Sequence, residues 1–401
     1  MNFTYKHTKF ACNTASIVSA IVNNYAPLLF VIFSKSFNLS VTQLSFIITL
    51  NFGTQIIVDF FGAKYADKIG YKKVVVISQF LCALGIIGLG TLPMVFSTPY
   101  IGILLAVLIY AVGSALIEVI TSPIMEALPN DSKSGSMSLM HSFYCWGCVV
   151  VILMSTLLFK IFGTDKWRYI SYFWSIVPIL NGLLFIKVPI NELKTEQENG
   201  ILKLFSNKIM WLFMLIMMCS GAAELTMSQW ASYFAESALG VSKTVGDLLG
   251  PCSFAVLMGI ARMLYGFYSS KINLKKFMVL SAVLCICSYA LTALVKNPFI
   301  SMIGCGICGF SVGIMWPGTL SLAAKIHPTG GASMFAIMAL FGDCGCFLGP
   351  ELTARVSEVF TIHGSGMKAG FLCAIIFPIL MIIAILTGVR GAEKRLKENQ
   401  N

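Results

Sequence analysis

Charged residues are scarce in this chain of 401 residues. Asp, Glu, Lys and Arg make up 11% of it, whereas a soluble globular protein has about 25%. In their place, 57% of the residues are hydrophobic and the mean hydropathy is +0.84. This composition excludes a soluble enzyme and a disordered chain. Since one bilayer crossing takes about 20 residues, the chain has room for about a dozen crossings and for no large soluble domain.

Several functional motifs are also missing. The sequence has no Gly-x-x-x-x-Gly-Lys-[Ser/Thr] loop and no His/Cys cluster in an aqueous segment, so we expect no ATP, metal or other cofactor and no enzyme activity. The thirteen cysteines are scattered through apolar runs without the spacing of a disulfide framework. The start of the chain lacks a signal-peptide cleavage pattern, which predicts a retained first helix.

Apolar runs predict an all-α membrane protein with twelve transmembrane helices. The runs are bounded by charges, Gly/Pro or polar clusters. They fall at about 10–34, 42–66, 74–96, 100–127, 137–162, 168–188, 208–236, 246–270, 277–296, 299–325, 333–359 and 368–389.

The distribution of positive charge predicts the orientation of these helices. The net charge of +11 would suggest nucleic acid in a soluble protein, but in a membrane protein it mainly sets topology. Of the 28 Lys and Arg residues, nineteen fall on the side of the termini, seven on the other side and two within spans. Basic residues accumulate on the cytoplasmic side. We therefore expect both termini in the cytoplasm and no nucleic-acid partner.

An internal repeat predicts two pseudo-symmetric halves of six helices each. Segment 112–137 has a counterpart at 312–334, and segment 37–41 has one at 238–242, both at an offset near 200 residues. The one long polar stretch lies between the halves. The predicted domains are an N-terminal half at 1–188, a cytoplasmic linker at 189–207 and a C-terminal half with a short cytoplasmic tail at 208–401.

Polar residues inside the predicted spans are the candidate site. A charge at the bilayer centre costs at least about 2.5–3.5 kcal/mol, so such residues normally face a partner or a wet cavity. Carboxylates and amides hydrogen-bond hydroxyl groups, and an aromatic ring packs on the C–H face of a sugar. The candidate solute-binding residues are Asn23, Asn24, Glu224, Gln229, Trp316 and Asp343, and the candidate proton-coupling residues are Glu118 and His141.

A structural role is open for several of these positions. Charged residues within the spans can simply pair, as expected for Glu351 and Arg355 one helical turn apart. A lone histidine such as His141 in an apolar helix is often a packing residue.

The loop after the second predicted helix carries a specific motif. Its glycines permit close helix contact and a tight turn, and its lysines suit a cytoplasmic membrane surface. The loop reads Gly62-Ala-Lys-Tyr-Ala-Asp67-Lys68-Ile-Gly70-Tyr-Lys72-Lys73. It resembles the signature G-x-x-x-(D)-[RK]-x-G-[RK]-[RK] of the major facilitator superfamily. The resemblance implies a conformational latch formed by Gly62, Asp67, Lys68, Gly70, Lys72 and Lys73.

Within that superfamily, the fourth and fifth predicted helices are similar to the fucose-permease branch of sugar:proton symporters. The resemblance rests on residues 118–123 and 141–147, and Glu118 falls on the proton-handling glutamate of the branch. Ser122 stands where the branch has an asparagine. Asn23 and Asn24 stand where it has a substrate-contacting aspartate.

We therefore expect a monomeric secondary transporter that binds its solute near the membrane midplane and works by alternating access. The expected activity is symport of a small polar solute, a monosaccharide or polyol, with protons or sodium, in a bacterial inner membrane. Two alternatives stay open. The first is a proton-driven efflux antiporter for amphipathic compounds, which Gly349-Pro350 supports. The second is a membrane receptor or assembly partner that transports nothing.

Overall fold

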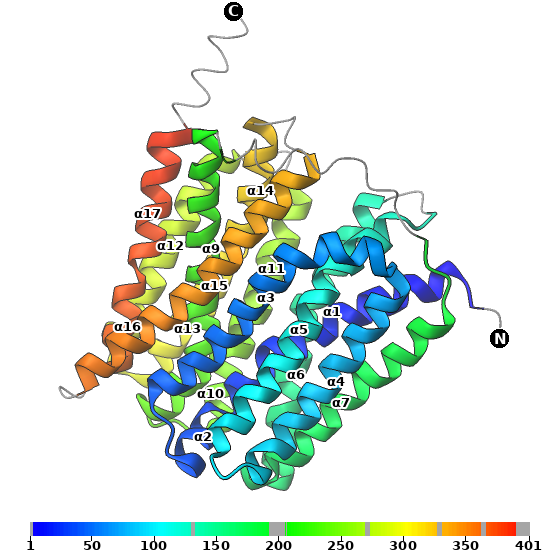
Figure 1. Ribbon diagram of the computed structural model, residues 1–401. Coiled ribbons are helices and arrows are strands. Elements are labelled where there is room, and N and C mark those ends of the chain that lie inside the picture. The colour runs from blue at the N-terminus through cyan, green and yellow to red at the C-terminus, as the bar shows by residue number, and fades with distance from the viewer. Residues whose placement is uncertain are drawn as a thin grey trace, which may run out of the picture. The chain divides into compact units, whose positions relative to one another are not determined.

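All the secondary-structure elements of the described residues are helices (Figure 1). The computed structural model describes residues 3–129, 133–191, 205, 207–268, 273–326, 331–361 and 366–389. It divides into two compact units, Met1–Thr195 and Glu196–Asn401. The predicted linker at 189–207 lies mostly outside the described residues.

The first unit is built from long helices that pack lengthwise, with α4 beside both α5 and α7 and α1 beside α6 (Figure 1). Its elements are α1 (Tyr5–Leu28), α2 (Phe30–Phe37), α3 (Val41–Ile69), α4 (Tyr71–Val95), α5 (Pro99–Glu126), α6 (Lys133–Phe162), the short turn η1 (Thr164–Lys166) and α7 (Trp167–Lys187).

The second unit pairs α9 with α15, α12 with α13, α11 with α13, and α15 with α16. Its elements are α9 (Lys208–Ser237), α10 (Lys243–Asp247), the π-helical turn η2 (Leu248–Cys252), α11 (Ser253–Tyr268), α12 (Leu274–Leu294), α13 (Pro298–Val312), α14 (Met315–Ile326), α15 (Gly331–Thr361), α16 (Gly366–Ala374), α17 (Ile376–Ile383) and the π-helical turn η4 (Ala384–Val389).

These elements confirm the prediction of an all-α membrane fold. Within the described residues, ten helices are long and apolar enough to cross a membrane, and the bent pair α1 and α2 makes an eleventh if it is one span. At 31 residues, α15 is also longer than a crossing needs. When α15 is included, the helical spans of the two units have the same bounds as the twelve predicted spans to within a few residues.

The sequence analysis missed three breaks within predicted spans, one of them at Ile375 between α16 and α17. The first span bends by 44° between α1 and α2, two residues after Pro27, whose ring nitrogen cannot donate to the carbonyl of Asn23. The tenth span is interrupted at 313–314, between α13 and α14. Pro317 follows this break, so the carbonyl of Gly313 lacks its helical N–H donor.

Glycines let the helices of the first unit approach closely. A Cβ at Gly113 on α5 would lie 2.7 Å from the backbone nitrogen of Cys82 on α4. A Cβ at Gly85 on α4 would lie 2.5 Å from the nitrogen of Tyr110 on α5. Lipid chains are as apolar as Leu, so close van der Waals contact is a main source of helix association inside a bilayer.

In the second unit, glycines likewise allow close contact between α9 and α15. Built Cβ atoms on both helices clash with backbone: that of Gly221 with the carbonyl oxygen of Gly342, and that of Gly345 with the oxygen of Met218. A Cβ at Gly349 would lie 2.6 Å from the oxygen of Ala222. From Met218 and Gly345 to Ala222 and Gly349 the contact advances by four residues on each helix, so α9 and α15 run parallel with their backbones touching.

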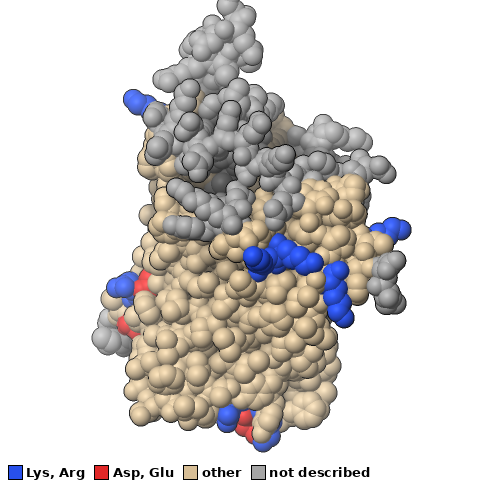
Figure 2. Space-filling model, turned by 45° about the vertical axis from the view of Figure 1, so that its right-hand side comes forward, with Lys and Arg blue, Asp and Glu red and all other residues tan. Residues whose placement is uncertain are grey.

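The surface suits a lipid environment. Figure 2 shows a wide area without Lys, Arg, Asp or Glu on the face toward the viewer, with basic residues above it and a small charged group below it. Large apolar side chains such as Leu180, Ile176 and Leu84 are at least half exposed. A soluble monomer rarely exposes apolar surface on this scale, whereas a bilayer covers it.

The close contact of α9 and α15 predicts that a methyl group added there lowers stability more than one added at a looser contact. Gly345→Ala forces a Cβ into the Met218 carbonyl, so we expect overpacking of about 1–3 kcal/mol and a lower Tm in detergent. Gly88→Ala on α4 is the matched control, because its nearest neighbour is the Leu92 side-chain tip at 3.3 Å. Equal Tm values for the two variants would contradict this packing.

Candidate functional site

A buried amide cluster lies around Asn23 in the first unit. The Asn23 Oδ1 atom accepts hydrogen bonds from Asn51 Nδ2 at 2.9 Å and from Gln55 Nε2 at 3.1 Å. Its Nδ2 atom donates to the Tyr144 hydroxyl at 3.4 Å. Asn51 Oδ1 is buried and accepts no hydrogen bond from the described residues. The cluster joins α1, α3 and α6 and carries no formal charge.

Sequence reasoning missed three members of this cluster. Asn51 and Gln55 lie four residues apart and therefore on one face of α3. Two amides in that register within an apolar helix are the signal that could have found them. Tyr144 on α6 carries no comparable pattern.

Asn24 has different partners from its neighbour. Its Nδ2 atom donates to the Ala20 carbonyl at 2.9 Å and contacts Cys148 Sγ at 3.2 Å. Its side chain is half-buried, whereas that of Asn23 is buried. The two adjacent amides point to different neighbours, because consecutive residues on a helix are about 100° apart.

Glu118 is exposed although it lies far inside α5. At about 1.5 Å per residue it lies about 28 Å and about 12 Å from the two helix ends. The exposed stripe of α5 at Ile101, Leu105 and Leu108 lies roughly 80° or more around the helix from it. A carboxylate facing lipid would cost several kcal/mol. Its position off the apolar stripe indicates a wetter environment.

An ion pair inside the second unit joins Glu224 on α9 to Arg262 on α11. The Arg262 Nη2 atom lies 3.3 Å from Glu224 Oε2 and 3.4 Å from Oε1. The Arg262 Nε atom donates to the carbonyl of Gly313 at 3.3 Å. Glu224 is 8% exposed. Sequence analysis found both charges within spans, but the pairing needs the fold, because their residues are 38 apart in the chain.

Trp316 packs on α15 at Gly342, the residue before Asp343. The ring of Trp316 covers Gly342 so closely that a Cβ there would clash with it. Asp343 is the next residue on α15 and is 8% exposed. Gly342 also touches Gly221, less than one turn from Glu224. Glu224 and Trp316 therefore both lie near Gly342, whereas the Asp343 side chain leaves α15 about 100° around the helix from that contact.

Gln229 does not share that face of α9. It lies five residues after Glu224, which is about 140° around the helix. Its side chain is 2% exposed. It therefore belongs to the packed interior on another side of α9.

The predicted latch is described only in part. Gly70 has φ of 93°, a left-handed conformation that favours glycine, and caps α4. Lys72 Nζ donates to the Val188 carbonyl at 3.2 Å, which neutralises the C-terminal end of α7. Lys73 is exposed. The side chains at 62–68, which include Gly62, Asp67 and Lys68, and that of His141 lie outside the described residues.

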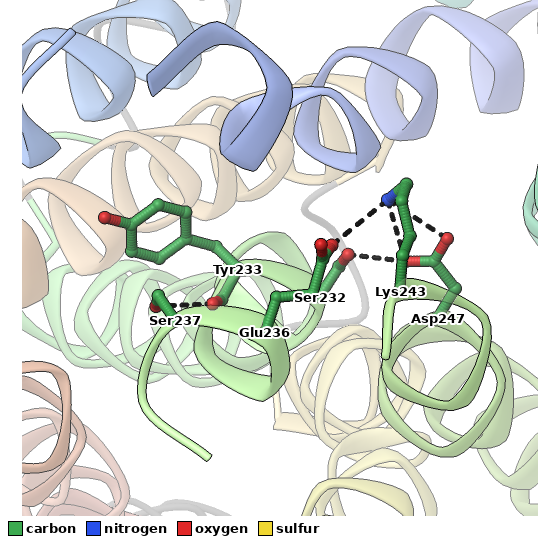
Figure 3. Close-up of polar contacts among 6 residues, drawn as sticks. All are labelled: Ser232, Tyr233, Glu236, Ser237, Lys243 and Asp247. Atoms are coloured by element: carbon green, nitrogen blue, oxygen red, sulfur yellow. Dashed lines mark hydrogen bonds and ion pairs between the residues drawn. The ribbon is translucent and has the colours of Figure 1, made fainter. Parts of the chain in front are cut away.

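A second charged cluster joins the end of α9 to α10 (Figure 3). Lys243 Nζ lies 3.1 Å from Asp247 Oδ2 and 3.3 Å from Glu236 Oε1. The Ser232 hydroxyl donates to Asp247 Oδ1 at 2.5 Å. Asp247 is fully buried, and both other charged side chains are nearly so. Two carboxylates thus share one ammonium group.

Sequence reasoning missed this cluster by assigning Lys243 to a loop. The i,i+4 spacing of Lys243 and Asp247 is a usable signal. The same spacing correctly predicted the pair of Arg355 and Glu351, whose Nε and Oε1 atoms are 2.7 Å apart. Among the described residues, no three His, Cys, Asp or Glu side chains are grouped so as to hold a metal ion.

The shared ammonium group predicts that Lys243 stabilises the fold. Lys243→Met leaves two nearly buried carboxylates without their cation, which costs about 3–5 kcal/mol for a broken buried pair. We expect a large fall in Tm in detergent. Adding Asp247→Asn should restore part of it, because one carboxylate then loses its charge. Lys296→Met, at an exposed lysine after α12, is the matched control. A Lys243→Met variant as stable as this control would show that the cluster contributes little.

The comparisons with known proteins agree with this architecture. The sequence matches the family model of the Major Facilitator Superfamily over residues 12–350. A comparison with curated proteins found no match. The fold is similar to that of a bacterial homolog of the human lysosomal transporter Spinster in an inward-facing and occupied conformation. That structure has a TM-score of 0.79 and 13% identity, covering 96% of this chain and 97% of that chain.

The fold is also similar to that of the nucleoside transporter NupG, with a TM-score of 0.73, 14% identity and coverage of 95% of this chain and 98% of that chain. At these identities the likeness concerns the fold alone. The family model, in contrast, spans most of this sequence. On that match, the chain belongs to the major facilitator superfamily.

Proposed function

We propose that this transporter moves a small polar solute, a monosaccharide or polyol, by symport with protons. Membership of the superfamily makes the chain a membrane transporter rather than an enzyme. Its chain contains no nucleotide-binding loop, so an ion gradient is the proposed energy source. The proposal includes a monomer in a bacterial inner membrane with both termini and the linker at 189–207 in the cytoplasm.

The exposed carboxylate of Glu118 is the observation that carries the proton-coupled mechanism. It is a titratable group in the interior of α5, whose other carboxylate, Glu126, stands at the last position of the helix. In the proposed mechanism Glu118 takes up a proton from one side of the membrane and releases it to the other. His141, one helix further along the chain, is proposed as a second proton-exchanging group.

The solute contacts are proposed in both units. The amide cluster around Asn23 supports hydrogen bonding to hydroxyl groups, because amides both donate and accept. The ring of Trp316 is proposed to pack on a sugar face, and Asp343, one residue after the glycine that this ring covers, is proposed to accept hydrogen bonds from it. The proposed solute-binding residues are Asn23, Asn24, Glu224, Trp316 and Asp343.

The loop between α3 and α4 is proposed as a conformational latch. Gly70 makes the turn, and Lys72 binds the end of α7. Asp67 is proposed to hold the resting conformation through its charge. The full latch comprises Gly62, Asp67, Lys68, Gly70, Lys72 and Lys73.

The proton role of Glu118 is tested by Glu118→Gln in proteoliposomes. Glutamine keeps the shape and hydrogen-bonding reach but does not titrate. We therefore expect loss of uphill accumulation driven by an imposed pH gradient, while exchange of solute for solute continues because it needs no net proton movement. Radiolabelled uptake and exchange are measured for the sugar or polyol that gives the largest thermal shift.

Glu358→Gln is the control, because it makes the same substitution at an exposed glutamate near the end of α15. It should accumulate solute like wild type. Accumulation by Glu118→Gln in response to a pH gradient would remove Glu118 from the coupling mechanism. A wild type that responds to sodium alone would replace proton symport by sodium symport.

A further inference from the structure

In the ion pair of the second unit, the cation Arg262 is more exposed than the anion Glu224. The side chain of Arg262 is 27% exposed, whereas that of Glu224 is 10% exposed. A solute reaching this pair therefore meets the guanidinium first. A guanidinium donates hydrogen bonds and accepts none, so the group that meets it must supply acceptor oxygens.

Two segments contact this guanidinium at points far from their own helix ends, at Glu224 and at Gly313. Glu224 lies about 24 Å and about 20 Å along the axis from the ends of α9. Gly313 lies about 22 Å from the start of α13 and about 20 Å from the end of α14. A partly exposed charge at this depth is strongly unfavourable against lipid. The exposed side of Arg262 is thus expected to face water or a polar ligand.

The break between α13 and α14 fixes the position of Arg262. Pro317 has no N–H, so the carbonyl of Gly313 has no donor from the next helical turn. Arg262 Nε supplies that hydrogen bond at 3.3 Å. A Cβ at Gly313 would lie 2.8 Å from the Cβ of Ala261, so a side chain at 313 would push the helices apart. The guanidinium is therefore held at the break by backbone as well as by Glu224.

The contact with Glu224 is loose for an ion pair. Its N to O separations are 3.3 and 3.4 Å, whereas a tight charge-assisted hydrogen bond of this type is about 2.7–2.9 Å. Both carboxylate oxygens share one nitrogen instead of forming two parallel hydrogen bonds. A second oxyanion can therefore compete with Glu224 for the guanidinium.

We propose that Arg262 binds an oxyanion of the transported solute, a carboxylate or a phosphate, and that Glu224 positions Arg262 and competes with the solute. This inference rests on the proposed transport function and narrows its solute to an acidic one. It also predicts the direction in which Glu224 changes the affinity for the anion. Removing its charge strengthens anion binding, whereas a direct solute contact would be weakened.

The test compares acidic probes with their neutral counterparts on the purified full chain. The pairs are glucuronate against glucose, gluconate against sorbitol, and glycerophosphate against glycerol. Thermal shift followed by titration gives Kd for each. We expect at least one acid to bind about tenfold or more tightly than its counterpart, equivalent to about 1.4 kcal/mol. Glucuronate and gluconate report a carboxylate, and glycerophosphate reports a phosphate.

Variants then assign the preference to Arg262. Arg262→Gln should remove it. Arg262→Lys keeps the charge without the planar fork and should retain a reduced preference, which covers a Gln variant that fails to fold. Glu224→Gln should bind the acid more tightly than wild type. Arg355→Gln, at a 69% exposed arginine, should behave like wild type.

Three results would overturn the inference: no acid preferred by wild type, a preference that survives Arg262→Gln, or weaker acid binding by Glu224→Gln. Uptake into proteoliposomes separates this inference from the broader proposal. Neutral solute transported equally by wild type and Arg262→Gln would leave proton symport standing and remove the anion site. Anion binding without transport of any probe would leave the anion site standing and remove the proposed symport.

Discussion

The bilayer offers no water to a polar group, and the rest of the structure follows from that constraint. A backbone N–H or carbonyl left unpaired in hydrocarbon costs several kcal/mol, so the chain forms helices throughout the described residues. Where a helix breaks, another group must replace the lost hydrogen bond. The Gly313 carbonyl loses its partner to Pro317 and regains one from Arg262. A charged side chain thus stabilises a helix defect at the membrane interior.

The same constraint separates the polar side chains into two kinds. Asp247 and Asn23 have partners within their own unit and are buried. Glu118 is exposed, and Arg262, although it pairs with Glu224, is 27% exposed. Buried and paired groups hold helices together. Groups that are exposed within a span need water or a ligand, which is why Glu118 and Arg262 carry the functional proposals.

The sequence predicted the helices better than their partners. Apolar runs located the spans, because span length depends only on bilayer thickness. Local spacing also found the pair of Arg355 and Glu351. The pairing of Glu224 with Arg262 and the grouping of Asn51 with Asn23 depend on which helices pack together, and hydropathy carries no such information. Pro317 was visible in the sequence, but the donor that compensates for it was not.

The break at Gly313 connects the parts of the second unit that bear charge. Arg262 holds one side of it, and the side chain of Trp316 leaves the chain directly after it and covers Gly342. Asp343 follows Gly342, and Gly342 touches α9 at Gly221, close to Glu224. A ligand that draws Arg262 away from Glu224 also pulls on the carbonyl at the break. Because the backbones of α9 and α15 are already in contact, they leave little room for adjustment. The strain would fall on the junction of α13 and α14, which makes this junction the element best placed to respond to binding.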